Sequence, residues 1–175
     1  MDEPSCNIEP LMSRQIIAKD SFQATVRAPG FSIGIRCDNH EIHGIVYLEP
    51  CAEKSPENPL AQKAVKEIKA YLENPEFHFT LPLRVFGTPF QLQVWREIAA
   101  IPCHQTRSYG DLAKALNSAP RAVGQACGAN PHPLIVPCHR VIAANGKLGG
   151  FARARGGFLI DTKRWLLVHE GHEGV

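Results

Sequence analysis

The chain has 175 residues, of which 44% are hydrophobic and 21% charged, a composition typical of one globular domain or of two small lobes that share a core. No apolar run approaches the ~20 residues needed to span a bilayer, and the acidic start Met1–Pro4 is unlike a secretory signal, so we expect a soluble cytoplasmic protein (nuclear in a eukaryote). Residues 1–90 carry 9 Lys/Arg and 12 Asp/Glu, a balance of −3, whereas residues 91–175 carry 10 and 5, a balance of +5. A polyanion is therefore expected to bind the second half.

The first half is expected to form a small sheet covered by one helix. Apolar residues recur with a helical period from Leu60 to Leu72, and residues 77–81 alternate like a strand. Since no catalytic grouping stands out before residue 87, we interpret residues 1–86 as a scaffold lobe. Three further segments are β-branched or alternating and predict strands: 22–27, 31–37 and 42–48.

From residue 87 the chain is expected to be mainly helical. Thr88, Pro89 and Gln91 form the pattern of a capping box, which predicts a helix to about residue 100. Ser108 opens a second helix, with Asp111 in its favourable first turn, and residues 119–128 predict a third. Two short helices joined by a tight turn indicate a helix-turn-helix in the lobe 87–175. The helix that ends near residue 100 should bury Phe90, Val94 and Ile98 on one face.

The third helix has an almost bare surface, because Ala122, Gly124 and Gly128 carry little or no side chain. A glycine inside a helix costs about 1 kcal/mol relative to alanine, so the close approach of another backbone is expected, either within the protein or from DNA. Arg121 stands in the first turn, where the helix dipole disfavours a cation. It either extends into water or meets an external partner such as a phosphate or an opened base stack.

Two Pro-Cys-His strings occur, at residues 102–104 and 137–139. Cys103 is expected in an ordinary loop between two helices. Cys138 follows the apolar run 134–136, which we interpret as a buried extended segment, and is followed by His139 and Arg140. A thiol at the end of such a segment, beside groups that carry positive charge, suits nucleophilic chemistry, although most lone cysteines are small core residues.

Residues 90–171 resemble the alkylguanine-DNA alkyltransferases, also called methylated-DNA–protein-cysteine methyltransferases. The resemblance covers about half the chain, in matching order and spacing. Its most specific part is Pro-Cys-His-Arg at 137–140 with Asn130-Pro131 upstream. The other matching stretches are Phe90-Gln91, Val94-Trp95, Ser108-Tyr109-Gly110, Arg121-Ala122-Val123-Gly124, Ile135-Val136, Val141-Ile142, Trp165-Leu166-Leu167 and His169-Glu170-Gly171.

The resemblance implies a stoichiometric repair reaction in which Cys138 accepts an alkyl group from O6 of guanine, and from O4 of thymine as a further possibility. His139 would act as its base through a water, and Glu170 would orient His139. The substrate would be a base flipped from double-stranded DNA, bound by a monomer that needs no organic cofactor. The other implied positions are Tyr109 and Asn130 at the reaction centre, Arg121, Ala122, Gly124, Arg140 and Tyr109 for DNA, and Pro133, Val141 and Phe151 for the pocket.

Three features depart from the family pattern. Cys103-His104 replaces an aromatic residue and glycine that relatives often have, and Phe151 replaces a tyrosine of the pocket wall. The segment 152–157 is longer than expected and basic, and we expect it to form a pocket rim that contacts DNA phosphates. Some relatives hold a structural zinc, but the spacing of the possible ligands here does not match one, so we expect no metal: Cys6, Cys37, His43 and His78.

Three other functions compete with this interpretation. A lesion-binding protein of the same fold lacks the acceptor cysteine, whereas this chain has Cys138. A helix-turn-helix transcription factor is expected to carry polar side chains on its recognition helix. A cysteine hydrolase leaves the bare helix unexplained. We therefore predict an α/β (α+β) protein with a sheet-and-helix lobe and a helical lobe that binds DNA.

Overall fold

The computed structural model describes residues 22–173, so the expectations for Met1–Pro4 and Cys6 lie outside the described residues. The elements follow one another as a sheet, a helix and then a mainly helical part, which confirms the α+β class. We use "N-terminal lobe" for residues 22–86 and "C-terminal lobe" for residues 87–173; the boundary itself stays a prediction. No helix within residues 22–173 is long and apolar enough to cross a membrane.

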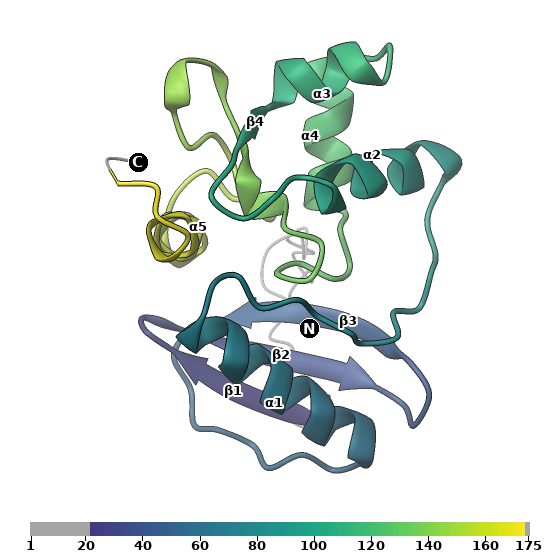
Figure 1. Ribbon diagram of the computed structural model, residues 1–175, viewed down its shortest axis with the longest axis vertical. Helices are drawn as coiled ribbons and strands as arrows, with labels where there is room; N and C mark the ends of the chain where they lie inside the picture. Colours follow the sequence, from purple (N-terminus) through teal and green to yellow (C-terminus); the bar gives the residue numbers. More distant parts are fainter. Residues whose placement is uncertain (1–21, 174–175) are drawn as a thin grey trace, which may run out of the picture.

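The N-terminal lobe is an antiparallel sheet in the order β1-β2-β3 (Ala24–Ala28, Phe31–Cys37 and Ile42–Leu48) with α1 (Pro59–Glu73) packed across it (Figure 1). These elements confirm the three strands and the helix expected from the sequence. Asn58 caps α1 by accepting a hydrogen bond from Ala61 N, and Pro59 occupies the first turn. Register places Val26, Ile33 and Tyr47 on one side of the sheet, where all three are buried.

The strand expected at residues 77–81 does not form. Its alternating aromatic residues pack around α1 instead, with the ring centroids of Tyr71 and Phe79 5.6 Å apart. The backbone N–H of Thr80 is taken by the Glu67 carboxylate, 2.8 Å away, which removes it from any ladder. The alternation of aromatic and polar residues at 77–81 therefore reflects contact with α1 rather than pairing in a sheet.

The outer edge of β3 is covered by two irregular segments. Ile42 N donates to Pro82 O at 2.8 Å, and Ile45 N donates to Pro131 O at 2.9 Å. The His132 ring also bonds Ile42 O, at 3.0 Å. The sheet thus holds the residues just upstream of Cys138 in place.

The C-terminal lobe contains α2 (Pro89–Ala99), α3 (Tyr109–Ala115), α4 (Pro120–Gly128) and α5 (Phe158–His169). Thr88 with Gln91 forms the expected capping box, and Ser108 with Asp111 forms a second one at the expected helix start. The helices α3 and α4 form the helix-turn-helix, and α5 lies between them and the sheet at one side of the molecule (Figure 1). Val94 and Ile98 are buried as expected, whereas Phe90 is only partly buried.

A short pair of parallel strands joins the segment before Tyr109 to the segment after Cys138. Strand β4 (Arg107–Ser108) pairs with β5 (Val141–Ile142), Arg107 opposite Val141. Because β4 leads directly into Tyr109 and β5 directly follows residues 138–140, Tyr109 is brought beside Cys138.

Candidate functional site

Cys138 does not end an extended segment. Residues 133–135 form a turn, with Leu134 at φ 77°, and Cys138 begins the short 3-10 helix η2 (Cys138–Arg140). The sequence favoured a strand because residues 134–136 are apolar, but prolines at 131, 133 and 137 remove three of the N–H groups that a ladder needs. Only Leu134 of the three apolar residues is fully buried.

Asn130 holds this turn closed. Its Nδ2 donates to Val136 O at 2.9 Å, and its Oδ1 accepts from His132 N at 3.0 Å. One amide therefore bridges the start and the end of the turn that carries Cys138.

His139 and Glu170 form a fully buried pair, with 2.9 Å between His139 Nε2 and Glu170 Oε1. An ionised carboxylate only accepts hydrogen bonds, so Nε2 carries the imidazole proton and Nδ1 keeps a lone pair. Among the described residues His139 Nδ1 has no hydrogen-bond partner. The pair therefore presents a buried, oriented base with one free nitrogen.

The protonation states fit a resting thiol and a neutral base. Burial raises the pKa of Cys138, while the Asn130 hydrogen bond and the Lys163 charge act to lower it. Burial lowers the pKa of His139, and Glu170 opposes this shift. Burial acts to raise the pKa of Glu170, but hydrogen bonds from His139 and Arg140 outweigh it and hold that pKa well below its usual range. Ionisation of the thiol therefore needs a nearby base.

Arg140 is not available to DNA, contrary to the expectation from sequence. Its Nε and one terminal nitrogen donate to the two oxygens of Glu170, each at 2.8 Å. The other terminal nitrogen donates to Ile101 O at 2.6 Å, and the side chain is 12% exposed. Because a bidentate ion pair with a buried carboxylate satisfies the guanidinium, Arg140 belongs to the network around Glu170.

A cleft of about 950 Å³ opens onto Cys138. Tyr109 and Phe151 line it, as expected, together with Arg121, Ala122 and Gly124 of α4. The two other residues expected in the pocket, Pro133 and Val141, are buried and do not line it. The reason is that the turn 133–135 and strand β5 direct these two residues into the core.

Lys163 stabilises the wall of the cleft from behind. Its buried ammonium donates to Val141 O at 2.7 Å, Leu148 O at 2.6 Å and Gly150 O at 3.2 Å. Burial lowers the pKa of Lys163 to about 8. The Tyr109 hydroxyl donates to the same Gly150 O at 3.0 Å, so a substrate that accepts from Tyr109 must compete with this carbonyl.

The two glycines of α4 have different explanations. A Cβ on Gly128 would lie 3.0 Å from Cγ of Arg153, a close contact with the rim of the cleft. A Cβ on Gly124 would meet only the Tyr109 ring, at the ordinary contact distance of 4.0 Å. Packing therefore explains Gly128, whereas the bare surface at Gly124 is left open to the cleft.

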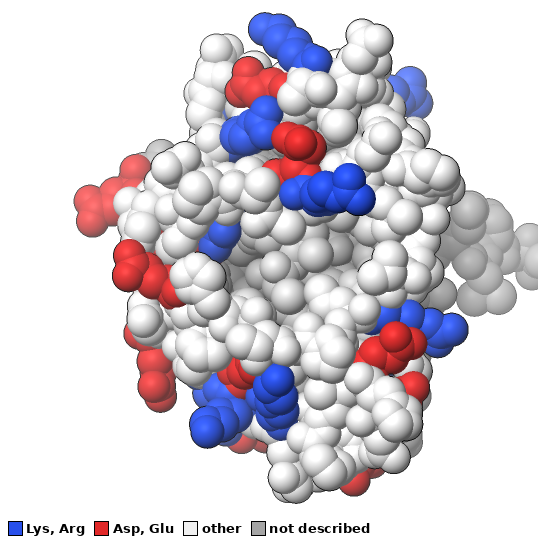
Figure 2. All heavy atoms as spheres, turned by 45° about the vertical axis from the view of Figure 1, so that its right-hand side comes forward, with Lys and Arg blue, Asp and Glu red and all other residues white. Residues whose placement is uncertain are grey.

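The basic segment 152–157 lies at the rim of the cleft, where Ala152 to Arg155 line it. Arg153 Nε donates to Gly128 O, 3.2 Å away, and so ties the rim to the end of α4. On the face that Figure 2 shows, Lys and Arg side chains are interspersed with Asp and Glu. The excess charge of the second half is thus not gathered into one patch there, partly because Arg140 and Lys163 are internal.

Cys103 does not share the surroundings of Cys138. It lies in the loop after α2, and its thiol donates to Pro75 O at 3.2 Å. Both ring nitrogens of His104, a residue at φ 65°, already have partners. Nδ1 lies 2.6 Å from the backbone oxygen of Glu170, and Nε2 lies 3.2 Å from the Glu76 carboxylate. This second Pro-Cys-His string holds the end of α5.

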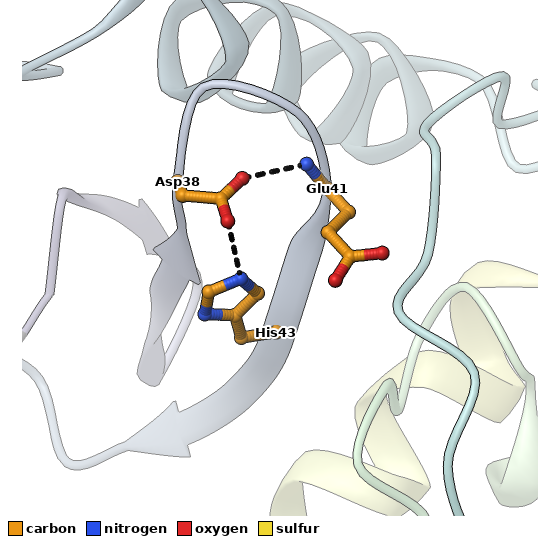
Figure 3. Close-up of side chains that lie close together, drawn as sticks. All are labelled: Asp38, Glu41 and His43. Atoms are coloured by element: carbon orange, nitrogen blue, oxygen red, sulfur yellow. Dashed lines mark hydrogen bonds and ion pairs between the residues drawn. The ribbon is translucent and has the colours of Figure 1, made fainter.

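One group of possible metal ligands occurs within residues 22–173: Asp38, Glu41 and His43. Asp38 accepts from His43 Nε2 at 3.0 Å and from Glu41 N at 2.9 Å, which closes the β2–β3 turn (Figure 3). Glu41 pairs with Arg84 at 3.5 Å. The turn and these pairs account for the cluster, and it includes neither Cys37 nor His78 of the ligand set considered for zinc.

Comparison with known proteins agrees with this geometry. The family model of the 6-O-methylguanine DNA methyltransferase DNA-binding domain matches residues 89–172. A methylated-DNA–protein-cysteine methyltransferase of Mycolicibacterium paratuberculosis is 43% identical over 125 residues, which cover 70% of this chain and 73% of that protein. The chain belongs to this methyltransferase family.

Other members of the methyltransferase family match over different lengths. A Shigella flexneri member is 50% identical over 95 residues, so this chain spans 53% of that relative's length. The crystal structure of a Mycobacterium tuberculosis OGT in complex with DNA superposes with a TM-score of 0.71 at 36% identity, covering 83% of this chain and 90% of that one.

Sequence reasoning missed two residues that this family member brings to the site, Lys163 and Tyr71. Lys163 stands three and four residues before Leu166 and Leu167, so a lysine on the buried face of an amphipathic helix was the available signal. Tyr71 of α1 donates its hydroxyl to Glu170 Oε1 at 2.8 Å across 99 residues of sequence. No local pattern marks such a partner.

Proposed function

We propose that this protein repairs duplex DNA by moving an alkyl group from O6 of guanine to Sγ of Cys138, once per molecule. The observation that carries the proposal is the buried Cys138 thiol at the cleft, next in sequence to a neutral His139 whose Nδ1 is unpaired and whose Nε2 is held by Glu170. Membership of the methyltransferase family supports the same reaction.

In the proposed reaction the thiol proton passes through a water to His139 Nδ1. Sγ then attacks the alkyl carbon, forming an S–C bond while the C–O bond breaks and its electron pair stays on the guanine oxygen. Tyr109, released from Gly150 O, donates a hydrogen bond to the guanine ring. The guanine anion finally takes up the proton that left the thiol. Thiol exchange does not cleave the C–S bond of a thioether, so the alkyl group stays on Cys138, the protein is consumed, and no organic cofactor takes part.

The test is the intact mass of the protein after incubation with duplex DNA that contains O6-methylguanine. We expect a gain of one methyl group per molecule, located by peptide mapping at Cys138, and no gain with undamaged duplex. Tight binding to the lesion without a mass gain would instead favour a protein that marks damage.

We propose that α4 enters the DNA and that Arg121 occupies the space left by the flipped base. Arg121 is exposed at the cleft, and among residues 22–173 it makes no hydrogen bond or ion pair. The bare surface at Ala122 and Gly124 beside it lets a backbone approach closely, as minor-groove binding requires. The rim segment 152–157 is proposed to contact phosphates.

Arg121→Ala is expected to slow transfer from duplex DNA by roughly tenfold or more, because holding a base out of the stack costs a few kcal/mol. Transfer from a free O6-alkylguanine base should not change, since no stack has to be opened. Single-turnover rates with both substrates check this. Arg96→Ala, an exposed arginine of α2 that does not line the cleft, is the control. Equal slowing with both substrates would contradict the role of Arg121.

A further inference from the structure

Tyr71 connects the N-terminal lobe to the site. It lies near the end of α1, its side chain is buried, and its hydroxyl donates to Glu170 Oε1 at 2.8 Å. Figure 1 shows α1 on the sheet and α5, which leads into Glu170, beside this lobe. The N-terminal lobe thus supplies the Tyr71 side chain, which contacts Glu170, the residue that orients His139.

The two oxygens of Glu170 are used unequally. Oε1 accepts from Tyr71, from His139 Nε2 at 2.9 Å and from a terminal nitrogen of Arg140 at 2.8 Å. Among the described residues, Oε2 accepts only from Arg140 Nε, at 2.8 Å. Tyr71 and His139 therefore share one oxygen, and each weakens the acceptor that the other uses.

The Tyr71 ring is held independently of its hydroxyl. It packs edge-on against the His169 ring, with centroids 5.3 Å apart, and against Phe79. His169 Nε2 also bonds the backbone oxygen of Tyr71, at 2.8 Å. Removing only the hydroxyl should therefore leave the ring, α1 and the end of α5 in place.

We propose that Tyr71 is a positioning residue for alkyl transfer: its hydroxyl fixes the rotation of the Glu170 carboxylate and limits how strongly Oε1 attracts the His139 imidazole. This inference rests on the proposed function. It makes the N-terminal lobe part of the apparatus that sets the basicity of His139, in addition to supporting the fold.

The sign of the effect follows from charge. A hydrogen bond from Tyr71 spreads part of the negative charge of Glu170, so its loss leaves a stronger acceptor for the protonated imidazole. The pKa of His139 should then rise, and less of the residue is neutral at a given pH. Because only neutral His139 takes the thiol proton, the acid limb of the rate profile should move to higher pH.

Other titratable or charged groups also face this pair, but each is the same in wild type and in a variant that lacks only one hydroxyl. A difference between the two profiles therefore isolates Tyr71. The groups are Tyr47 of β3, Cys103 and His104 of the loop after α2, Cys138 and Arg140 of η2, and Lys163 and His169 of α5.

The test compares wild type, Tyr71→Phe and Tyr47→Phe in single-turnover transfer across pH 5.5–9. Tyr47 is a matched control because its buried hydroxyl has no partner among the described residues. We expect Tyr71→Phe to lower the plateau rate roughly 3- to 10-fold and to raise the midpoint of the acid limb by about 0.5 pH unit, with unchanged DNA affinity. Tyr47→Phe should follow wild type.

The inference is overturned if the pH–rate profiles of Tyr71→Phe and wild type superimpose while thermal unfolding shows that both proteins are folded. Tyr71 would then be a packing residue. Alkylation of Cys138 by iodoacetamide gives a second profile that needs no DNA. If wild type transfers nothing from damaged DNA, the proposed function fails, while the iodoacetamide profiles still decide whether Tyr71 acts through His139.

If Tyr71→Phe does not fold, the wild-type protein carries the test. The hydroxyl proton of Tyr71 should be protected from exchange, and its NMR signal should titrate with the same midpoint as the ring nitrogens of His139. If the chemical shift of the Tyr71 hydroxyl proton does not change as His139 titrates, the inference is overturned.

Discussion

Cys138→Ala is expected to abolish alkyl transfer, whereas Cys103→Ala and Cys127→Ala should retain it. Cys127 is the stringent comparison, because it is a buried thiol that lines the same cleft. Burial raises the pKa of Cys127 to about 12, and its neighbours in sequence are Ala126 and Gly128 rather than a histidine. Cys103 donates to Pro75 O outside the cleft. Among the described cysteines, only Cys138 combines access to the cleft with a histidine next to it in sequence.

Intact mass after exposure to O6-methylguanine duplex measures all three variants. Cys138→Ala should still bind the damaged duplex, since α4, the helix proposed to enter the DNA, does not contain the thiol. A methyl group gained by Cys138→Ala and lost from Cys127→Ala would move the acceptor to α4. A gain retained by all three single variants would point to more than one acceptor.

Glu170→Gln is expected to slow transfer by roughly 10²- to 10⁴-fold, as neutralising the orienting carboxylate does in nucleophile–base–carboxylate sites. The same change leaves the Arg140 guanidinium without a charged partner, and breaking a buried ion pair in this way costs about 3–5 kcal/mol. Single-turnover kinetics and thermal unfolding measure the two effects. Glu76→Gln, in the exposed pair with His104, is the matched control and should change neither appreciably.

The loss of stability in Glu170→Gln should depend on pH. The pKa of Glu170 in the folded protein lies below the value of 4.5 that it has when unfolded. Its stabilising effect is therefore complete above about pH 4.5 and is lost as the pH falls through the folded pKa. The difference in unfolding free energy between wild type and variant should be constant from pH 7 to about 5 and should narrow below it. A constant difference down to pH 3 would contradict the assigned ionisation.

Local chemistry made most helices of this protein predictable. The capping boxes at Thr88 and Ser108 and the proline at 120 fixed where three helices begin, because these signals act within one turn. Alternation and apolar runs were less reliable. At 77–81 and 134–136 they reflected packing against α1 and a proline-braced turn, which depend on contacts far away in the sequence.

The site was predictable only in part, for the same reason. The motif around Cys138 and His139 is continuous in sequence, and its resemblance to a family supplied Glu170. The resemblance implied that Arg140 contacts DNA, yet its position relative to Glu170 is set only by the fold. Tyr71 acts across 99 residues, so only the folded chain reveals it.

The covered edge of β3 has a consequence for self-association. An exposed strand edge is a template on which a second chain can add a strand. Here that edge meets the carbonyls of Pro82 and Pro131. The segment 82–84 already pairs with this edge in a parallel bridge, because Ile42 O accepts from Arg84 N, so an added strand would have to displace both segments. The segment that leads into the reactive thiol therefore also closes the sheet against edge-to-edge polymerisation.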